Sequence, residues 1–181
     1  MSNTNNPRLT VPVNESDHIL GPQDARVTVV KYGDFECPDC AKSHHVIEKM
    51  TRELQEDVRL VYRHFPLVNV HPHALRAAEA AEAAAAQGKF WEMHNLLFTN
   101  PNELRDKDLR KHAMEIRLDL DRFDDEMARG VHAQKILKNR DLSITQGITG
   151  TPTIFVNDEL WAMSGIELVQ AITALVEQRV A

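Results

Sequence analysis

The chain has 181 residues, of which 43% are hydrophobic and 27% are charged, and its formal net charge is −6. This length and composition suit one domain with a hydrophobic core and exclude a largely disordered chain. The negative net charge gives no electrostatic reason to expect nucleic acid or an anionic membrane as a partner, and no apolar run approaches the ~20 residues that cross a bilayer.

The first 17 residues differ in composition from the rest of the chain. Residues 1–17 are rich in Asn, Ser, Pro and Thr and lack the basic-then-apolar order of a secretory signal. We therefore expect a flexible N-terminal arm in a cytoplasmic protein. The chain contains two cysteines, whereas a secreted disulfide scaffold of this length normally carries several pairs.

The first predicted unit is a β-α-β motif. Residues 26–32 form a β-branched run bounded by Gly21-Pro22 and Gly33-Asp34, which is typical of a buried strand. From Ala41 onward, apolar residues recur at helical spacing, and residues 58–64 then read as a second strand. We expect the two strands to be parallel and the crossover to be right-handed.

The middle of the chain predicts a helical insertion, and its end predicts a hairpin and a helix. An alanine-rich helix runs from His71 to Ala86 and stops near Gly88. Further helices are expected at residues 89–98, 102–116, 121–129 and 131–146. After them, residues 150–157 and 160–163 predict a β-hairpin, and the last helix starts near Ile166.

The two cysteines form the motif Cys37-Pro38-Asp39-Cys40, which falls where the first strand meets its helix. Such a motif is a redox dithiol, half of a zinc site or an accident. A helix N-terminus favours the thiolate form of Cys37, and Cys40, one turn further in, is expected to keep its proton until it attacks a mixed disulfide. Pro38 suits the first helical position, where the missing N–H costs no hydrogen bond.

Acidic residues surround Cys37. Asp39 supports the helix dipole but repels a neighbouring thiolate by on the order of 1 kcal/mol when solvent screens the pair, and Asp34 and Glu36 add to this repulsion. We therefore expect the pKa of Cys37 to fall less than in strongly activated dithiols, which predicts a mild oxidant or a reductase. The alternative interpretation is that Asp39 is simply a good helix-start residue.

Four motifs in this order resemble one known family. They are Gly33-Asp34-Phe35-Glu36-Cys37-Pro38-Asp39-Cys40, His71-Pro72-His73-Ala74 with Arg76-Ala77-Ala78-Glu79-Ala80-Ala81, Gly88-Lys89-Phe90-Trp91, and Gly150-Thr151-Pro152-Thr153. Together they resemble the DsbA-like branch of the thioredoxin superfamily. The resemblance implies an α/β thioredoxin-like fold (β-α-β, then β-β-α) in a single domain over residues 18–181, with its core at 18–66 and 147–181 and an all-helical insertion at 67–146.

The same resemblance implies an activity and a site. The activity is thiol–disulfide exchange, with Cys37 as nucleophile and Cys40 as resolving cysteine. Pro152 is implied to be cis and to face them, which leaves the backbone of Thr151 free to pair with an extended substrate. The implied partners are protein or small-molecule thiols and disulfides, with glutathione or a thioredoxin-type reductant among them. No cofactor beyond the Cys37–Cys40 disulfide and no metal is expected.

One position departs from the family pattern. Its members often carry an acidic residue in the first strand, beneath the resolving cysteine, and the matching residue here is Lys31. We expect Lys31 to point outward as an ordinary surface charge and assign it no catalytic role.

Three other functions remain open. Cys37, Cys40, His44 and His45 nominally supply four zinc ligands, but adjacent histidines on a helix diverge by about 100°. The helical insertion is also compatible with a non-catalytic polypeptide-binding module, and the fold with a glutathione-dependent transferase or isomerase.

His71 and His73 are expected to belong to a helix start. The aromatic residues Phe90, Trp91 and Phe98 are expected in the core of the insertion.

Overall fold

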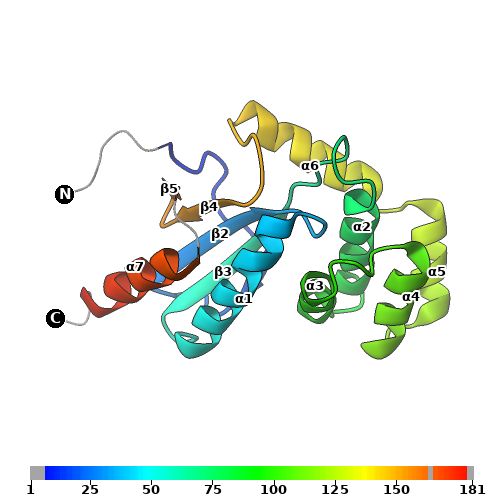
Figure 1. The fold of residues 1–181 in the computed structure, drawn as a ribbon, viewed down its shortest axis with the longest axis horizontal. Helices are drawn as coiled ribbons and strands as arrows, with labels where there is room; N and C mark the ends of the chain where they lie inside the picture. Colours follow the sequence, from blue (N-terminus) through cyan, green and yellow to red (C-terminus); the bar gives the residue numbers. More distant parts are fainter. Residues whose placement is uncertain (1–6, 163–164, 179–181) are drawn as a thin grey trace. The chain divides into compact units, whose positions relative to one another are not determined.

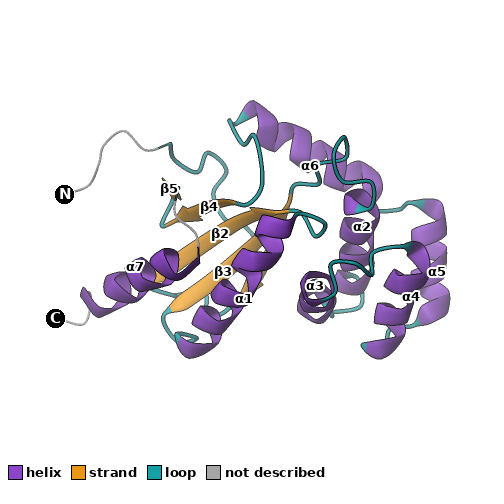
Figure 2. Ribbon diagram, viewed as in Figure 1, coloured by secondary structure: helices purple, strands orange, loops and turns teal. Residues whose placement is uncertain are grey.

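The computed structural model describes residues 7–162 and 165–178. The chain divides into two compact units, which are described separately here. A sheet unit comprises Met1–Tyr32, Lys42–Arg63 and Pro152–Ala181, and a helical unit comprises Gly33–Ala41 and His64–Thr151. Figure 1 gives the order of the elements along the chain, and Figure 2 separates the strands from the helices.

A five-stranded sheet in the order β1-β3-β2-β4-β5 forms the sheet unit. The strands are β1 (His18–Leu20), β2 (Val27–Gly33), β3 (Val58–His64), β4 (Thr153–Val156) and β5 (Glu159–Trp161). The sequence predicts β2 and β3 to within one residue, and it misses β1, whose three residues are too few for a periodic signal. Strand β1 pairs antiparallel with β3.

Strand β2 lies inside the sheet, between β3 and β4. Its residues Val27, Val29 and Val30 are at most 1% exposed, as expected for a strand covered on both faces. Strand β4 pairs with it antiparallel, in a register that places Ile154 opposite Lys31. This central position explains why the strand is a continuous β-branched run rather than an alternating one.

The predicted hairpin is confirmed in its described part. Strands β4 and β5 pair antiparallel, and the turn residues Asn157 and Asp158 have φ values of 46° and 70°. Asn and Asp tolerate this left-handed region well, and two such residues in succession make the turn that matches the twist of a hairpin. Met163, the last residue of the predicted second strand, lies outside the described residues.

Two helices complete the elements associated with the sheet. Helix α1 (Pro38–Glu53) buries Ile47 and Met50, and helix α7 (Gly165–Gln178) buries Leu168 and Ile172. Both sets of residues recur at intervals of three or four, so each helix turns one apolar side inward. The helical spacing of apolar residues after Ala41 is what predicted α1.

The helical unit holds the alanine-rich helix and four further helices, which Figure 2 shows in purple. They are α2 (Ala74–Ala85), α3 (Phe90–Thr99), α4 (Asp106–Glu115), α5 (Leu120–Arg129) and α6 (Ala133–Thr145). Helix α2 contacts each of the other four. Its buried alanines allow this, because side chains of one carbon let neighbouring helices approach on several sides.

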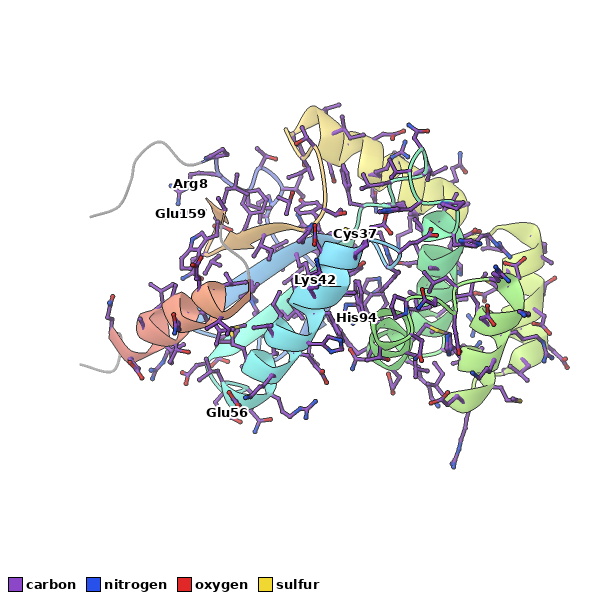
Figure 3. The ribbon with its side chains drawn as sticks, in the orientation of Figure 1. Arg8, Cys37, Lys42, Glu56, His94 and Glu159 are labelled. Carbon is purple, nitrogen blue, oxygen red and sulfur yellow. The ribbon has the colours of Figure 1, made fainter. Side chains whose placement is uncertain are left out.

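Residues 7–17 of the predicted arm are hydrogen-bonded to the sheet unit. Leu9 N donates to Asp158 O at 2.8 Å, and Arg8 forms a β-bridge with Glu159, beside which it is drawn in Figure 3. Asp17 accepts two hydrogen bonds from Arg63, at 2.7 and 2.8 Å. Residues 1–6 lie outside the described part of the chain.

Candidate active site

Cys37 immediately precedes the first residue of α1 (Figure 3). Its carbonyl accepts the first helical hydrogen bond, from Ala41 N at 3.1 Å, and its own N–H donates to Asp34 O at 3.2 Å. Cys37 and Cys40 are not joined by a disulfide; Cys37 is 6% exposed and Cys40 is fully buried. The nucleophile predicted from the sequence is therefore the more accessible of the two sulfurs.

The surroundings of Cys37 favour its thiolate. The pKa of Cys37 is lowered to about 5, chiefly because the side chain of Cys40 hydrogen-bonds to its sulfur. Burial opposes this effect, while the Thr151 side chain and the backbone N–H groups of Cys40 and Asp39 reinforce it. Hydrogen bonds at a helix N-terminus stabilise an anion in this way, so Cys37 is ionised at neutral pH.

The residues predicted to support the site occupy distinct places. Pro38 is the first residue of α1 and Asp39 lies in its first turn, both exposed. The Sγ atom of Cys37 lies 3.5 Å from the backbone oxygen of Thr151. The Thr151 hydroxyl is buried, and the Thr151 side chain contributes to the lowered pKa of Cys37. Pro152 follows directly and begins the segment that enters β4.

Two carboxylate–histidine pairs stand next to the dithiol, and the sequence did not reveal them. Nδ1 of His71 lies 2.8 Å from a carboxylate oxygen of Asp34, and Nδ1 of His73 lies 2.9 Å from one of Glu36. His73 does precede α2, as the predicted helix start implies. The matching spacing of two acids and two histidines, each pair separated by one residue, was the only sequence signal for this pairing.

Asp34 organises the backbone around the site. One of its carboxylate oxygens accepts the N–H of Glu36 at 2.8 Å, and the other accepts the N–H of Leu67 at 2.9 Å as well as the bond from His71. Its side chain is fully buried. A carboxylate that accepts several hydrogen bonds in a buried place holds the segments that donate them in fixed positions.

Phe35 anchors the same segment to α3. Its ring lies 4.8 Å from that of Phe98 and 5.7 Å from that of His94, centroid to centroid. Phe90 and Phe98 are 5% and 1% exposed, so the predicted aromatic core of the insertion is confirmed for these two. The aromatic contacts fix the residues just before Cys37 within the helical unit.

Lys31 contradicts the expectation of an outward surface charge, because it is 1% exposed. Its place inside the sheet unit follows from its strand: β2 is covered on both faces, so no position in its middle reaches solvent. Burial lowers the pKa of His44 to about 3, and the charges of Lys31 and His45 contribute to this shift. His44 is buried while His45 is exposed, in keeping with the predicted divergence of the two rings.

Comparisons with known proteins agree with this geometry. A family model described as Thioredoxin matches residues 13–174. A thioredoxin-like oxidoreductase from Silicibacter pomeroyi superposes with a TM-score of 0.76 at 28% identity, covering 93% of this chain and 95% of the other. BdbD from Bacillus subtilis, in its oxidised form, superposes with a TM-score of 0.73 at 24% identity over 88% and 92% of the two chains, which supports the fold.

Two curated relatives are named as ion antiporters rather than as oxidoreductases. Over 153 residues the chain is 50% identical to the Na(+)/H(+) antiporter NhaA 3 of Salinispora tropica, which covers 82% of this chain and 23% of the relative. It is 39% identical over 155 residues to NhaA 1 of Mycolicibacterium gilvum, covering 83% and 25%. The chain thus spans about a quarter of the length of these relatives. Within the described residues, none of the helices combines the length and apolarity needed to cross a membrane.

Proposed function

This chain belongs to the thioredoxin family, and we propose that it is a thiol–disulfide oxidoreductase whose dithiol is Cys37 and Cys40. The observation that carries the proposal is the hydrogen bond from the Cys40 side chain to Cys37, which with the other donors lowers the pKa of Cys37 to about 5. A thiolate held beside a second, buried thiol is the arrangement that disulfide exchange requires. The DsbA-like fold supports the same chemistry.

The proposed reaction consists of two thiol–disulfide exchange steps. The Cys37 thiolate attacks one sulfur of a substrate disulfide, the substrate S–S bond breaks, and the departing sulfur leaves as a thiolate that takes a proton from solvent. Cys40 then loses its proton and attacks the Cys37 sulfur of the mixed disulfide, which releases the second substrate thiol. Two electrons pass from the protein dithiol to the substrate. The reverse sequence oxidises a substrate dithiol.

Supporting roles follow for the residues around the dithiol. Pro38 preorganises the first turn of α1, and the N–H of Asp39 stabilises the thiolate. Thr151, whose backbone oxygen lies near the Cys37 sulfur, would pair with an extended substrate segment if its bond to Pro152 is cis, as the family resemblance implies. The proposed substrates are protein or small-molecule disulfides, with glutathione or a thioredoxin-type protein as reductant in the cytoplasm.

Insulin reduction tests the activity. We expect the wild type to reduce insulin with dithiothreitol as electron donor and Cys37→Ser to be inactive. Cys40→Ser keeps the nucleophile but cannot resolve the intermediate, so it should accumulate a mixed disulfide with the substrate that mass spectrometry detects. Equal activity of the wild type and Cys37→Ser would reject the proposal and favour a polypeptide-binding or zinc-binding module.

The antiporter relatives suggest a second candidate, in which the chain acts as a redox module on a sodium–proton antiporter. The observation behind it is the 50% identity to part of such a protein. Co-expression of Cys40→Ser with an antiporter from the same genome should then trap a mixed disulfide between the two chains. Absence of this species, while insulin is still reduced, would reject the candidate and leave the first proposal intact.

A further inference from the structure

Asp34 joins His71 to the segment that carries the nucleophile. Its backbone oxygen accepts the N–H of Cys37 at 3.2 Å, while its carboxylate accepts the bond from His71 Nδ1 at 2.8 Å. The imidazole and Cys37 are therefore attached to the same residue through two different groups. His71 lies 34 residues after Cys37 in the sequence, so only the folded helical unit brings it here.

The imidazole of His71 is fixed in its orientation by its surroundings. Its side chain is 16% exposed, and the carboxylate beside it is fully buried. The loop before it is fixed as well, because Leu67 N donates to Asp34 and Leu67 O accepts the N–H of His71 at 2.8 Å. A ring fixed at Nδ1 by a carboxylate carries its proton there, which leaves Nε2 as the titrating nitrogen.

We propose that His71, protonated and anchored by Asp34, supplies the positive charge beside Cys37 that favours its thiolate over its thiol. His71 is thus a positioning residue that acts through the field at the sulfur, and Asp34 is its anchor. The inference deepens the proposed function, because it takes Cys37 as the nucleophile. It also reverses the effect expected of the acidic residues: each acts together with a histidine rather than as a bare negative charge.

The electrostatics around His71 favour a positive charge on its imidazole. Burial lowers the pKa of His71, but the hydrogen bond that His71 donates to Asp34 and the charges of Asp34, Cys37 and Glu36 outweigh it, so the pKa of His71 is raised from its ordinary value of 6.5. Glu36 is in turn paired with His73, whose side chain is 38% exposed. A protonated His71 offsets the negative charge of the Asp34 carboxylate that it binds.

Linkage makes the coupling reciprocal. If the Cys37 thiolate raises the pKa of His71, then protonated His71 lowers the pKa of Cys37 by the same amount. A solvent-screened pair of charges at close range is worth up to about one pKa unit. The coupling therefore predicts two measurable shifts of equal size and opposite sign.

The first measurement uses His71→Asn in the reduced protein. The Asn amide nitrogen can take the place of Nδ1 and keep the bond to Asp34, while the charge is lost. We expect the thiolate absorbance titration of Cys37 to shift upward by up to about one unit, and its alkylation rate by iodoacetamide at acid pH to fall by up to about tenfold. His73→Asn is the matched control and should change both quantities less, because its imidazole is more exposed.

The second measurement observes His71 itself. In Cys37→Ser the thiolate is gone, so the pKa of His71, followed by NMR titration of its imidazole, should fall by the amount that Cys37 shifted in His71→Asn. An unchanged His71 pKa, or an equal response of Cys37 to His71→Asn and His73→Asn, would overturn the proposal. Urea unfolding of each variant shows whether its fold is retained.

These results are separable from those on the proposed function. Absorbance, alkylation and NMR titrations report on the charge state of Cys37 and His71 whether or not the protein turns over a disulfide. Loss of insulin reduction with intact coupling would reject the oxidoreductase and leave the pairing in place. Normal insulin reduction with no coupling would reject the role of His71 alone.

Discussion

Asp34 and Glu36 illustrate how the meaning of a residue depends on its partner. In the sequence both are acidic neighbours of a thiolate and are expected to disfavour it. In the fold each accepts a bond from a histidine, at 2.8 Å for His71 and 2.9 Å for His73. The net charge that Cys37 meets therefore depends on residues that no local window includes.

His44 makes the stability of the protein depend on pH. It is 3% exposed, and burial, with the charges of Lys31 and His45, lowers its pKa to about 3 from 6.5. Unfolded chains therefore take up a proton in this interval that the folded chain does not. The stability contributed by neutral His44 is present above about pH 6.5 and is lost as the pH falls toward 3.

Replacing His44 should weaken this acid sensitivity. We expect His44→Gln to reduce the loss of unfolding free energy between pH 7 and pH 4 by on the order of 2–3 kcal/mol relative to the wild type. Urea unfolding at both pH values measures it. His45→Gln is the matched control, since His45 is exposed, and should leave the loss as it is. An identical acid response of His44→Gln and wild type would contradict the assignment.

Local residues mark both ends of α5 in the helical insertion. Asp119 precedes α5, and its side chain accepts a hydrogen bond from Arg122 N at 3.1 Å. Gly130 ends the helix in the left-handed conformation, with φ of 59°, that glycine adopts without strain. Asp119 is a local start signal and Gly130 a local stop signal, which is why the predicted segment 121–129 agrees with α5 to one residue.

The cap of α5 offers a test at the scale of one helix. Asp119→Ala leaves the N–H of Arg122 without its acceptor, so the free energy of unfolding should fall by about 1 kcal/mol. Asp119→Asn retains an oxygen that can accept the bond and should recover most of the loss. Both are measured by urea denaturation; an Asn variant as destabilised as the Ala variant would mean that the cap bond is not the cause.

Arg63 ties the N-terminal segment to the sheet unit. Its guanidinium donates to both carboxylate oxygens of Asp17, to the carbonyls of Val11 and Pro12, and to the hydroxyl of Tyr32. The Arg63 and Asp17 side chains are 11% and 8% exposed. The polar composition of residues 1–17 predicts flexibility, and no pattern within that segment indicates that Asp17 forms an ion pair with a residue 46 positions away.

Loss of Arg63 should free this segment. Arg63→Ala leaves Asp17 as an unpaired, nearly buried charge, so we expect a loss of about 3 kcal/mol in unfolding free energy and faster proteolysis within residues 7–17, detected by mass spectrometry of the fragments. Arg63→Lys keeps the charge without the bidentate geometry and should be intermediate. Cleavage in the wild type as fast as in Arg63→Ala would show that the bonds do not hold the segment.

The sequence by itself determined the Cys37–Cys40 motif, its place at the start of α1, the order of the strands and helices that follow β1, and the hairpin. Each of these depends on spacing within about ten residues, where periodicity, caps and turn residues act directly. Only the tertiary structure decided that β1 joins the sheet, that Lys31 is buried, and that His71 and His73 meet the acids before Cys37. Those outcomes depend on contacts between segments far apart in the chain, which are formed by packing and leave no local pattern.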